Sequence, residues 1–309
     1  MRRIAWALPV LAVLLSACGA GPPAGQAAGQ SAGQSTGQPH VSTKPSAKPI
    51  RSSRPVSASG SSTASDPSAA SGLSTAGGGP GRFPPTGRGI LDGKVVLVDP
   101  GHNGGNFGAP SVINRLIWNG RETETCDTPG AETDGGYTEA LFNWDVALYL
   151  TADLRAEGAT VVLTRTSNTG VGPCVTERAA IGNEVHANAA VSIHADGGPP
   201  GGRGFAILEP VADGINNAIV GPSAILGADL RAAFGKGTGE PVSSYDGING
   251  IQPRDDLAGT NLSKVPKVFI ECANMRNAAD AALVTSSRWQ ALAARAIAAG
   301  LAAFLVTHR

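Results

Sequence analysis

From Gly19 to Gly89 the sequence has few large apolar side chains. This stretch consists almost entirely of Gly, Ser, Ala, Pro, Gln and Thr, and it contains the imperfect repeat GQAAGQSAGQSTGQP. Such a composition buries too little apolar surface to offset the entropy lost when the backbone is ordered. We therefore predict a disordered tether over residues 19–90 and a single folded part over residues 91–309.

The chain also lacks a basic excess. It has 24 Lys and Arg against 24 Asp and Glu, but residues 91–309 alone hold 16 basic and 23 acidic residues. A mildly acidic folded part does not offer the basic surface that nucleic acids attract. We expect no nucleic-acid partner, and we expect a monomer.

No apolar run near the N-terminus is long enough to span a membrane as a permanent helix. The run Ile4–Leu15 follows two arginines and precedes Ser16-Ala17-Cys18, which is the layout of an export signal. The tetrapeptide that ends at Cys18 resembles the lipobox of bacterial lipoproteins. We predict a signal over residues 1–18 and an exported protein, lipid-anchored through Cys18 at the outer face of the cytoplasmic membrane or in the cell wall. An ordinary signal with an incidental cysteine is the alternative.

Only four cysteines are present, and two of them lie in Gly- and Pro-rich loop sequence. These two, Cys126 and Cys174, suit a disulfide in an exported protein. If paired, they close a loop of about 49 residues, which contributes at most ~4 kcal/mol on the chain-entropy model. Two free loop thiols are the alternative. Cys272 follows an apolar run and is predicted to be a buried thiol.

After residue 90, short β-rich runs alternate with helical stretches. This alternation favours an α/β fold with an open, mostly parallel, twisted sheet and helices on both faces. The predicted strands are Lys94–Asp99, Thr160–Thr164, Ala190–His194, Gly204–Leu208 and Lys267–Glu271. The predicted helices are Tyr137–Glu157, with Gly158 as its stop signal, Val175–Ala187, Ser223–Phe234 and Ser286–Val306.

An insertion from Pro110 to Gly136 separates the first predicted strand from the first predicted helix. Within it, Asn119-Gly120 lies between two short extended runs, which is a strong hairpin signal. We predict a hairpin close to the functional site with Cys126 at its base. We hypothesise that this hairpin gates access to the site.

Histidine is scarce, and the five that are present narrow the search for a site. His40 lies in the predicted tether, His308 lies at the terminus, and His186 fits an ordinary surface or packing position. His102 and His194 instead follow β-runs directly, in VVLVDPGH and AAVSIH. Ligands gather at the carboxyl ends of parallel strands, and two imidazoles with one carboxylate are a common catalytic zinc set.

Two glutamates are candidates for the carboxylates of such a site. Glu139 opens the first predicted helix, where a carboxylate also interacts favourably with the helix dipole. Glu271 ends the last predicted strand, where a carboxylate rarely sits for stability, although a salt bridge at the rim of the sheet is an alternative.

Four blocks in order carry a resemblance to a known family. They are DPGHNGG, GYTEALFNWDVALYLTADLRAEGATVVLTR, ERAAIGNEVHANAAVSIHADG and KVPKVFIECANMRN, within Lys94 to about Ala303. The set resembles the zinc-dependent N-acetylmuramoyl-L-alanine amidases, which cleave bacterial peptidoglycan. The resemblance implies that His102, Glu139 and His194 bind Zn²⁺, that Glu271 serves catalysis, and that peptidoglycan or a soluble muropeptide is the substrate.

Some positions depart from the family pattern or have two interpretations. Asp196 stands where the family usually has Asn, and Ala273-Asn274 stands where it usually has Gly-Phe, so these departures bear on substrate detail more than on the zinc chemistry. Asp99 is either a partner of a ligating imidazole or a turn residue, and Arg165 either contacts the stem peptide or pairs structurally. A zinc peptidase that cuts stem-peptide bonds and a non-catalytic wall-binding lipoprotein are the alternative functions.

Overall fold

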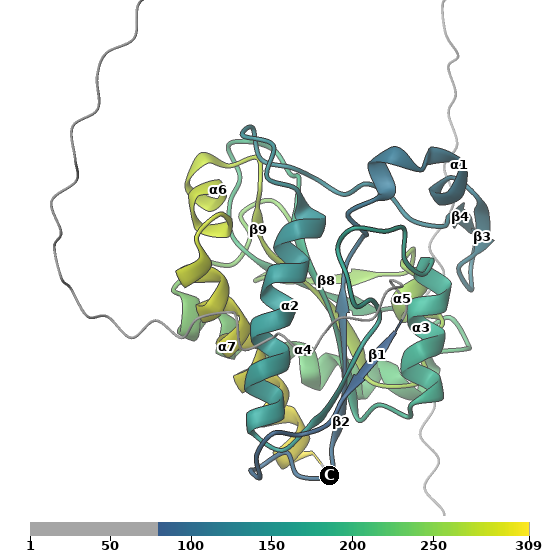
Figure 1. Cartoon of the computed structure of the whole chain (residues 1–309), viewed down its shortest axis with the longest axis vertical. Coiled ribbons are helices and arrows are strands. Elements are labelled where there is room, and N and C mark those ends of the chain that lie inside the picture. Colours follow the sequence, from purple (N-terminus) through teal and green to yellow (C-terminus); the bar gives the residue numbers. More distant parts are fainter. Residues whose placement is uncertain (1–79, 309) are drawn as a thin grey trace, which may run out of the picture. The chain divides into compact units, whose positions relative to one another are not determined.

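The computed structural model describes residues 80–308, so the predicted signal, Cys18 and most of the predicted tether lie outside the described residues. A seven-stranded mixed sheet forms the centre, in the order β1-β5-β2-β6-β9-β7-β8 (Figure 1). Its strands are β1 (Gly81–Phe83), β2 (Val95–Pro100), β5 (Thr160–Leu163), β6 (Ala189–Asp196), β7 (Ala206–Pro210), β8 (Ile251–Arg254) and β9 (Lys267–Asn274).

The sheet is mostly parallel, and this part of the α/β prediction is confirmed. The pairs β2–β5, β2–β6, β6–β9 and β7–β8 are parallel, whereas β1–β5 and β7–β9 are antiparallel. Consequently the carboxyl ends of β2, β6 and β9 lie at the same edge of the sheet. That edge positions the functional site.

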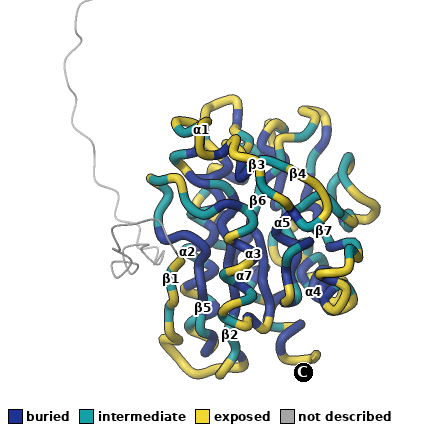
Figure 2. Tube along the Cα trace, turned by 90° about the vertical axis from the view of Figure 1, so that its right-hand side faces the viewer, coloured by how far each residue is buried: buried dark blue, intermediate teal, exposed yellow. Residues whose placement is uncertain are grey.

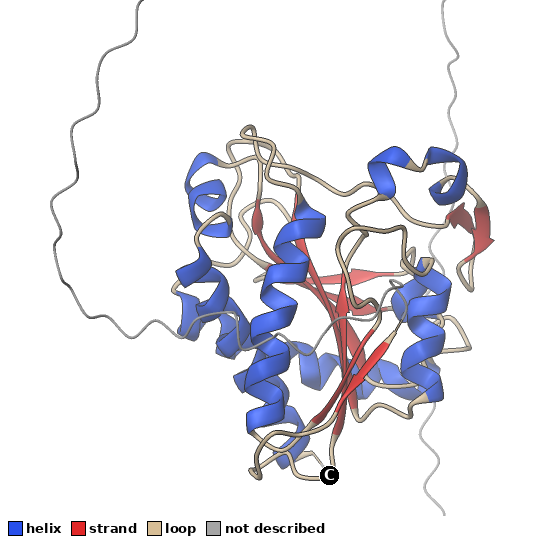
Figure 3. Ribbon diagram, viewed as in Figure 1, coloured by secondary structure: helices blue, strands red, loops and turns tan. Residues whose placement is uncertain are grey.

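Helices cover the two faces of the sheet, as Figure 3 shows. They are α1 (Pro110–Ile113), α2 (Glu139–Ala156), α3 (Val175–Glu184), α4 (Asn217–Thr238), α5 (Ala258–Asn261), α6 (Ala278–Val284) and α7 (Ser287–Thr307), with a short 3₁₀ turn at Asn106–Gly108. Side chains alternate across β2, so Val96 and Val98 join the larger core while Leu97 joins a smaller one. Figure 2 shows this buried centre in dark blue.

Helix α2 begins and ends at the residues that its sequence favours. The Thr138 side chain caps its first turn by accepting a hydrogen bond from the Leu141 N–H at 3.4 Å. At its other end Gly158 has a φ of +98°, which glycine adopts readily. The N–H of Gly158 then donates to the Arg155 carbonyl and that of Ala159 to the Leu154 carbonyl. This Schellman termination turns the chain directly into β5.

Helix α7 packs closely against α4. Gly300 has no side chain at the point where the backbone of Leu230 approaches, and Ile297 and Leu301 are fully buried. Within the described residues, α7 is the one helix long and apolar enough to cross a membrane. Its apolar composition is accounted for by this packing in the core.

The insertion forms the predicted hairpin. Its strands β3 (Leu116–Trp118) and β4 (Thr123–Thr125) pair antiparallel on either side of Asn119-Gly120. The side-chain oxygen Oδ1 of Asn119 accepts hydrogen bonds from the backbone N–H groups of Arg121 and Glu122 at 2.9 and 2.8 Å. These two bonds close the turn. Exposed residues predominate around α1 and β3, at the far end of the insertion (Figure 2).

Several elements differ from the prediction. Strand β1 lies at residues 81–83, within the stretch predicted as tether, so the folded part begins before residue 91. Strand β8 was not predicted because it contains Pro253, which an edge strand tolerates. Helix α4 begins at Asn217 and not at Ser223, because the helix continues through Pro222. The short helices α1, α5 and α6 were not predicted either.

Glu209 is a carboxyl between the sheet and α4 whose ionisation should lower the stability of the fold. It is half-buried on β7 against Gly227, and burial raises its pKa from 4.5 to about 7. Ionisation therefore disfavours the folded state increasingly as pH rises from 4.5 to 7. We expect Glu209→Gln to raise the free energy of unfolding at pH 8 by about 1 kcal/mol or less, because solvent screens a half-exposed carboxylate.

Urea unfolding of the wild type and of Glu209→Gln, each at pH 4 and pH 8, measures this effect. The gain in stability should be present at pH 8 and absent at pH 4. An equal difference at both pH values would contradict an ionisation effect and would indicate a packing effect.

Candidate metal centre

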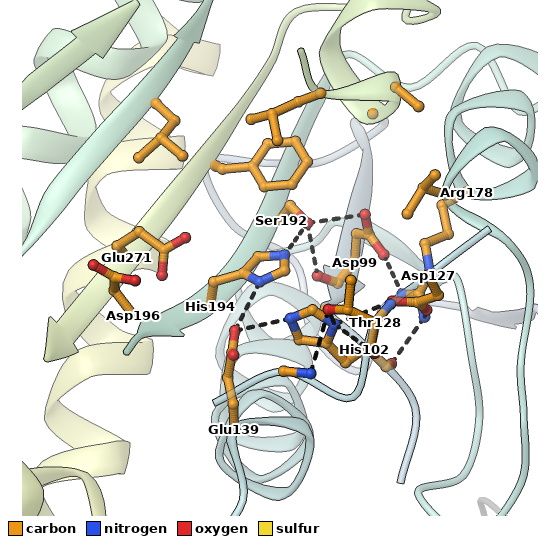
Figure 4. Close-up of a pocket in the computed structure, with 18 of the residues that line it drawn as sticks. Asp99, His102, Asp127, Thr128, Glu139, Arg178, Ser192, His194, Asp196 and Glu271 are labelled. Carbon is orange, nitrogen blue, oxygen red and sulfur yellow. Dashed lines mark hydrogen bonds and ion pairs between the residues drawn. The ribbon is translucent and has the colours of Figure 1, made fainter. Parts of the chain in front are cut away.

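The three predicted ligands meet at the carboxyl edge of the sheet (Figure 4). His102 follows β2, Glu139 opens α2, and His194 lies near the end of β6. Glu139 Oε1 is 3.2 Å from His102 Nε2 and 2.9 Å from His194 Nδ1. One atom from each residue falls within 4.8 Å of the others, so the group could hold a metal ion.

The chain after β2 needs small residues to form this site. A side chain at Gly101 would overlap the ring of His194, and one at Gly130 would collide with His102 and Glu139. His102 itself has a φ of +55°, in the left-handed region that few non-glycine residues adopt. Such backbone strain is of order 1–3 kcal/mol and is typical of functional positions. In this backbone conformation the His102 ring points toward Glu139, with Nε2 at 3.2 Å from Oε1.

Glu139 is held in a fixed orientation. Its Oε2 accepts a hydrogen bond from the Ala131 N–H at 2.7 Å, and its Oε1 lies between the two histidines. The carboxyl is buried, which opposes its ionisation, but His102 and His194 hold its pKa well below the usual value. A fixed, ionised carboxylate between two imidazoles is a suitable donor set for a divalent cation.

The other ring nitrogen of His102 has partners that the sequence did not reveal. His102 Nδ1 lies 3.1 Å from Asp127 Oδ1 and 3.1 Å from the Thr128 carbonyl oxygen. Burial opposes protonation of His102, but the Glu139 and Asp127 carboxylates outweigh it and raise the pKa to about 10. Asp127 lies 25 residues from His102 inside the insertion, where no periodic pattern indicates which side chains face the site.

Asp99 is buried beside the metal centre without touching His102. It lies 2.9 Å from Lys267 Nζ and 2.8 Å from Arg178 Nη1, and it accepts a hydrogen bond from Ser192 Oγ at 3.0 Å. Burial opposes its ionisation, but Lys267 and Arg178 hold the pKa of Asp99 well below its usual value. Its link to the centre runs through Ser192, which lies 3.2 Å from His194 Nε2.

Glu271 lies on the other side of His194 (Figure 4). It is the β9 residue in register with His194 of β6. Its Oε2 is buried and has no hydrogen-bond partner. Burial and the charges of Glu139 and Asp196 raise the pKa of Glu271 well above its usual value. A carboxyl with a buried, unpartnered oxygen beside a cation site is suited to proton transfer.

These residues line one cavity of about 390 Å³. Glu124 and Thr125 of the hairpin form part of its wall, and Arg254 and Leu257 form another part. The hairpin also contacts the loop after β8, where Asn119 Nδ2 donates to the Asp256 carbonyl oxygen at 3.2 Å. The insertion therefore lies directly against the site, as predicted.

The two loop cysteines form a disulfide that ties the insertion to α3. Cys126 is bonded to Cys174, the residue that precedes α3. This bond places Asp127 near Arg178, whose Nη2 is 3.5 Å from Asp127 Oδ2. Cys272 is a free buried thiol, and burial raises its pKa well above the usual value.

Arg165 has a structural position. It is 1 % exposed, and its guanidinium donates to the carbonyl oxygens of Pro100 at 3.0 Å and Ala140 at 2.8 Å. Burial lowers its pKa to about 9. Of its two interpretations, contact with a stem peptide is not supported, because Arg165 does not line the cavity.

Comparisons with known proteins agree with this geometry. The family model described as N-acetylmuramoyl-L-alanine amidase matches residues 96–303. The chain is 41% identical over 219 residues to the N-acetylmuramoyl-L-alanine amidase Rv3717 of Mycobacterium tuberculosis, covering 71% of this chain and 89% of that protein.

Two solved amidase structures are also similar to this chain. The amidase Ami1 of Mycobacterium smegmatis is 42% identical with a TM-score of 0.66, over 70% of this chain and 98% of that one. The apo form of Ami1 from Mycobacterium abscessus is 39% identical with a TM-score of 0.66, over 70% of this chain and 100% of that one.

Proposed function

The chain belongs to the N-acetylmuramoyl-L-alanine amidase family and is a peptidoglycan hydrolase, and we propose that its hydrolysis depends on a zinc ion held by His102, Glu139 and His194. The bond to be cleaved joins the lactyl carbonyl of N-acetylmuramic acid to the amine of L-alanine. The observation that carries the proposal is the meeting of His102 Nε2, Glu139 Oε1 and His194 Nδ1 in one cavity with Glu271.

The donor set fits zinc. Two imidazole nitrogens and one carboxylate oxygen, with space left for water and substrate, are a familiar catalytic zinc arrangement. The second ring nitrogen of each histidine already has a partner, Asp127 for His102 and Ser192 for His194. Such partners hold ligating imidazoles in place before a metal arrives. Bound there, zinc would acidify water and polarise the substrate carbonyl as a Lewis acid.

Glu271 is proposed to move the protons. Glu271 lines the cavity beside the centre, and its unpartnered Oε2 can accept a proton from the attacking water. The raised pKa of Glu271 makes the carboxylate a stronger base and lets the protonated form persist until the amine departs. Delivering that proton to the nitrogen matters because an amine leaves poorly as an anion.

The cell-wall setting gives the N-terminal residues a role. Peptidoglycan lies outside the cytoplasmic membrane, so the export signal predicted over residues 1–18 agrees with the function. We propose that Cys18 carries a lipid and that the residues between Cys18 and strand β1 tether the enzyme to the membrane. This proposal rests on the sequence alone.

Mass spectrometry of digested peptidoglycan and of soluble muropeptides tests the function. We expect stem peptides with a free L-alanine amine, and we expect no product once a chelator has removed the metal. Cleavage within the stem peptide would instead identify a zinc peptidase. Intact substrate under all conditions would identify a wall-binding protein. Unchanged activity after complete metal removal would contradict the zinc proposal.

A further inference from the structure

Ser192 lies directly behind the metal centre, next to the candidate ligand His194. The residue is 1 % exposed, and its Oγ is 3.2 Å from His194 Nε2 and 3.0 Å from Asp99 Oδ2 (Figure 4). Ser192 and His194 are two apart on β6, so their side chains point to the same face. The β2–β6 register places Asp99 opposite Ser192.

Asp99 can only accept hydrogen bonds. It is 2 % exposed, it forms ion pairs with Lys267 and Arg178, and it accepts a further bond from Thr164 Oγ1 at 2.7 Å. Two cations on one buried carboxylate keep it ionised, so it has no proton to give. The Ser192 proton must therefore point to Asp99, which leaves the lone pairs of Ser192 Oγ facing the ring of His194.

We propose that Ser192, oriented by Asp99, is a positioning residue that accepts a hydrogen bond from the Nε2–H of His194 and so holds the ring with Nδ1 toward Glu139 and the metal. The inference rests on the proposed zinc site. A ligating imidazole normally donates its second N–H to a fixed acceptor, and loss of that acceptor typically weakens metal binding about 10- to 100-fold. Here the acceptor is the Ser192 hydroxyl, and Asp99 sets its direction because the hydroxyl donates its proton to that carboxylate.

His102 has a parallel arrangement with a direct carboxylate partner. Its Nδ1 faces Asp127, and one guanidinium connects the two systems, because Arg178 Nη1 is 2.8 Å from Asp99 Oδ1 and Nη2 is 3.5 Å from Asp127 Oδ2. The carboxylates behind both histidines thus share one buried cation. This shared cation keeps both groups acceptors only, which is the state that the two ring N–H groups require.

Zinc affinity of the full-length chain tests the role of Ser192. We expect Ser192→Ala to bind zinc about 10- to 100-fold more weakly than the wild type in competition with a chromophoric chelator. Thr164→Val is the matched control, because it removes another buried hydroxyl from the same Asp99 carboxylate without touching His194. Its zinc affinity should stay within about twofold of the wild type, because Thr164 is not the partner of a ligating imidazole, whose loss typically costs about 10- to 100-fold.

The hydrogen bond itself can be observed in ¹⁵N–¹H NMR spectra of the zinc-loaded chain. We expect the His194 Nε2–H proton to exchange slowly with water in the wild type and in Thr164→Val, and to exchange faster in Ser192→Ala. Wild-type zinc affinity in Ser192→Ala, or an equal loss in Thr164→Val, would overturn the inference. If Ser192→Ala does not fold, fast exchange of the His194 Nε2–H proton in the zinc-loaded wild type overturns the inference. A wild type that binds no zinc would overturn the proposed zinc site and this inference with it, whereas wild-type zinc affinity in Ser192→Ala overturns the inference alone.

Discussion

Glu271→Gln is expected to lower kcat for lactyl-amide hydrolysis by about 10²- to 10⁴-fold, the contribution typical of general acid–base catalysis. Glutamine keeps the shape of the side chain but cannot take a proton from water. Glu271 is not one of the three side chains that meet as a metal group, so zinc content should remain that of the wild type. Steady-state kinetics on a muropeptide, together with metal analysis of the same preparations, measures both quantities.

Glu209→Gln is a matched control for this experiment. It makes the same chemical change on the neighbouring strand β7, with the side chain against α4 and outside the cavity. Its kcat should equal that of the wild type. Hydrolysis at the wild-type rate by Glu271→Gln would show that another group transfers the proton. Loss of zinc by Glu271→Gln would show that Glu271 holds the metal as well.

The positions of the candidate ligands could be predicted because they follow from a simple geometric rule. His102 and His194 each end an apolar β-run, and parallel strands bring such ends to one edge. Glu139 opens the helix that begins at that edge, and Glu271 lies on β9, next to β6 and in register with His194. Hydrophobic runs and helix starts indicate where each of these residues lies, but the resemblance of four sequence blocks to a known family was needed to choose Glu139 and Glu271 over their alternative interpretations.

The residues behind the ligands could not be predicted, because they depend on strand register and on loop conformation. Asp99 faces Ser192 only in the register that β2 and β6 adopt. Both strands are buried on both faces, so their sequences lack the apolar–polar alternation that would have indicated this register. Asp127 reaches His102 because a disulfide anchors the residue before it to α3. Lys267 is the first residue of β9, as predicted, but the sequence did not indicate that it is buried, at 1 % exposed, and paired with Asp99.

Substitution of either histidine ligand is the second change from which we expect a large loss, here of zinc affinity. We expect His102→Ala and His194→Ala each to weaken zinc binding by about 100-fold or more, because a metal site of three protein ligands loses one of its few donors. Hydrolysis should be lost at zinc concentrations that saturate the wild type. Competition titration and the muropeptide assay measure the two effects in parallel.

His102→Ala should also destabilise the metal-free protein, unlike a change that only removes a ligand. The pKa of His102 is raised from 6.5 to about 10, so its protonated ring stabilises the metal-free fold fully below pH 6.5, and this contribution is lost as pH rises through 10. Without the ring, Glu139 and Asp127 lose their shared cation, and breaking such a buried pair typically removes about 3–5 kcal/mol.

His186→Ala is a control that separates the loss of the His102 imidazole from the effect of placing alanine in a strained backbone conformation. His186 is exposed and has a φ of +48°, close to the +55° of His102, so both substitutions place alanine in the same strained conformation. We expect His186→Ala to keep wild-type zinc affinity and hydrolysis. If it lost zinc as His102→Ala does, the loss would follow from backbone strain and not from the missing imidazole. If His102→Ala kept wild-type affinity, His102 would not be a ligand, and the metal would have to be held by Glu139 and His194 with a group other than this ring.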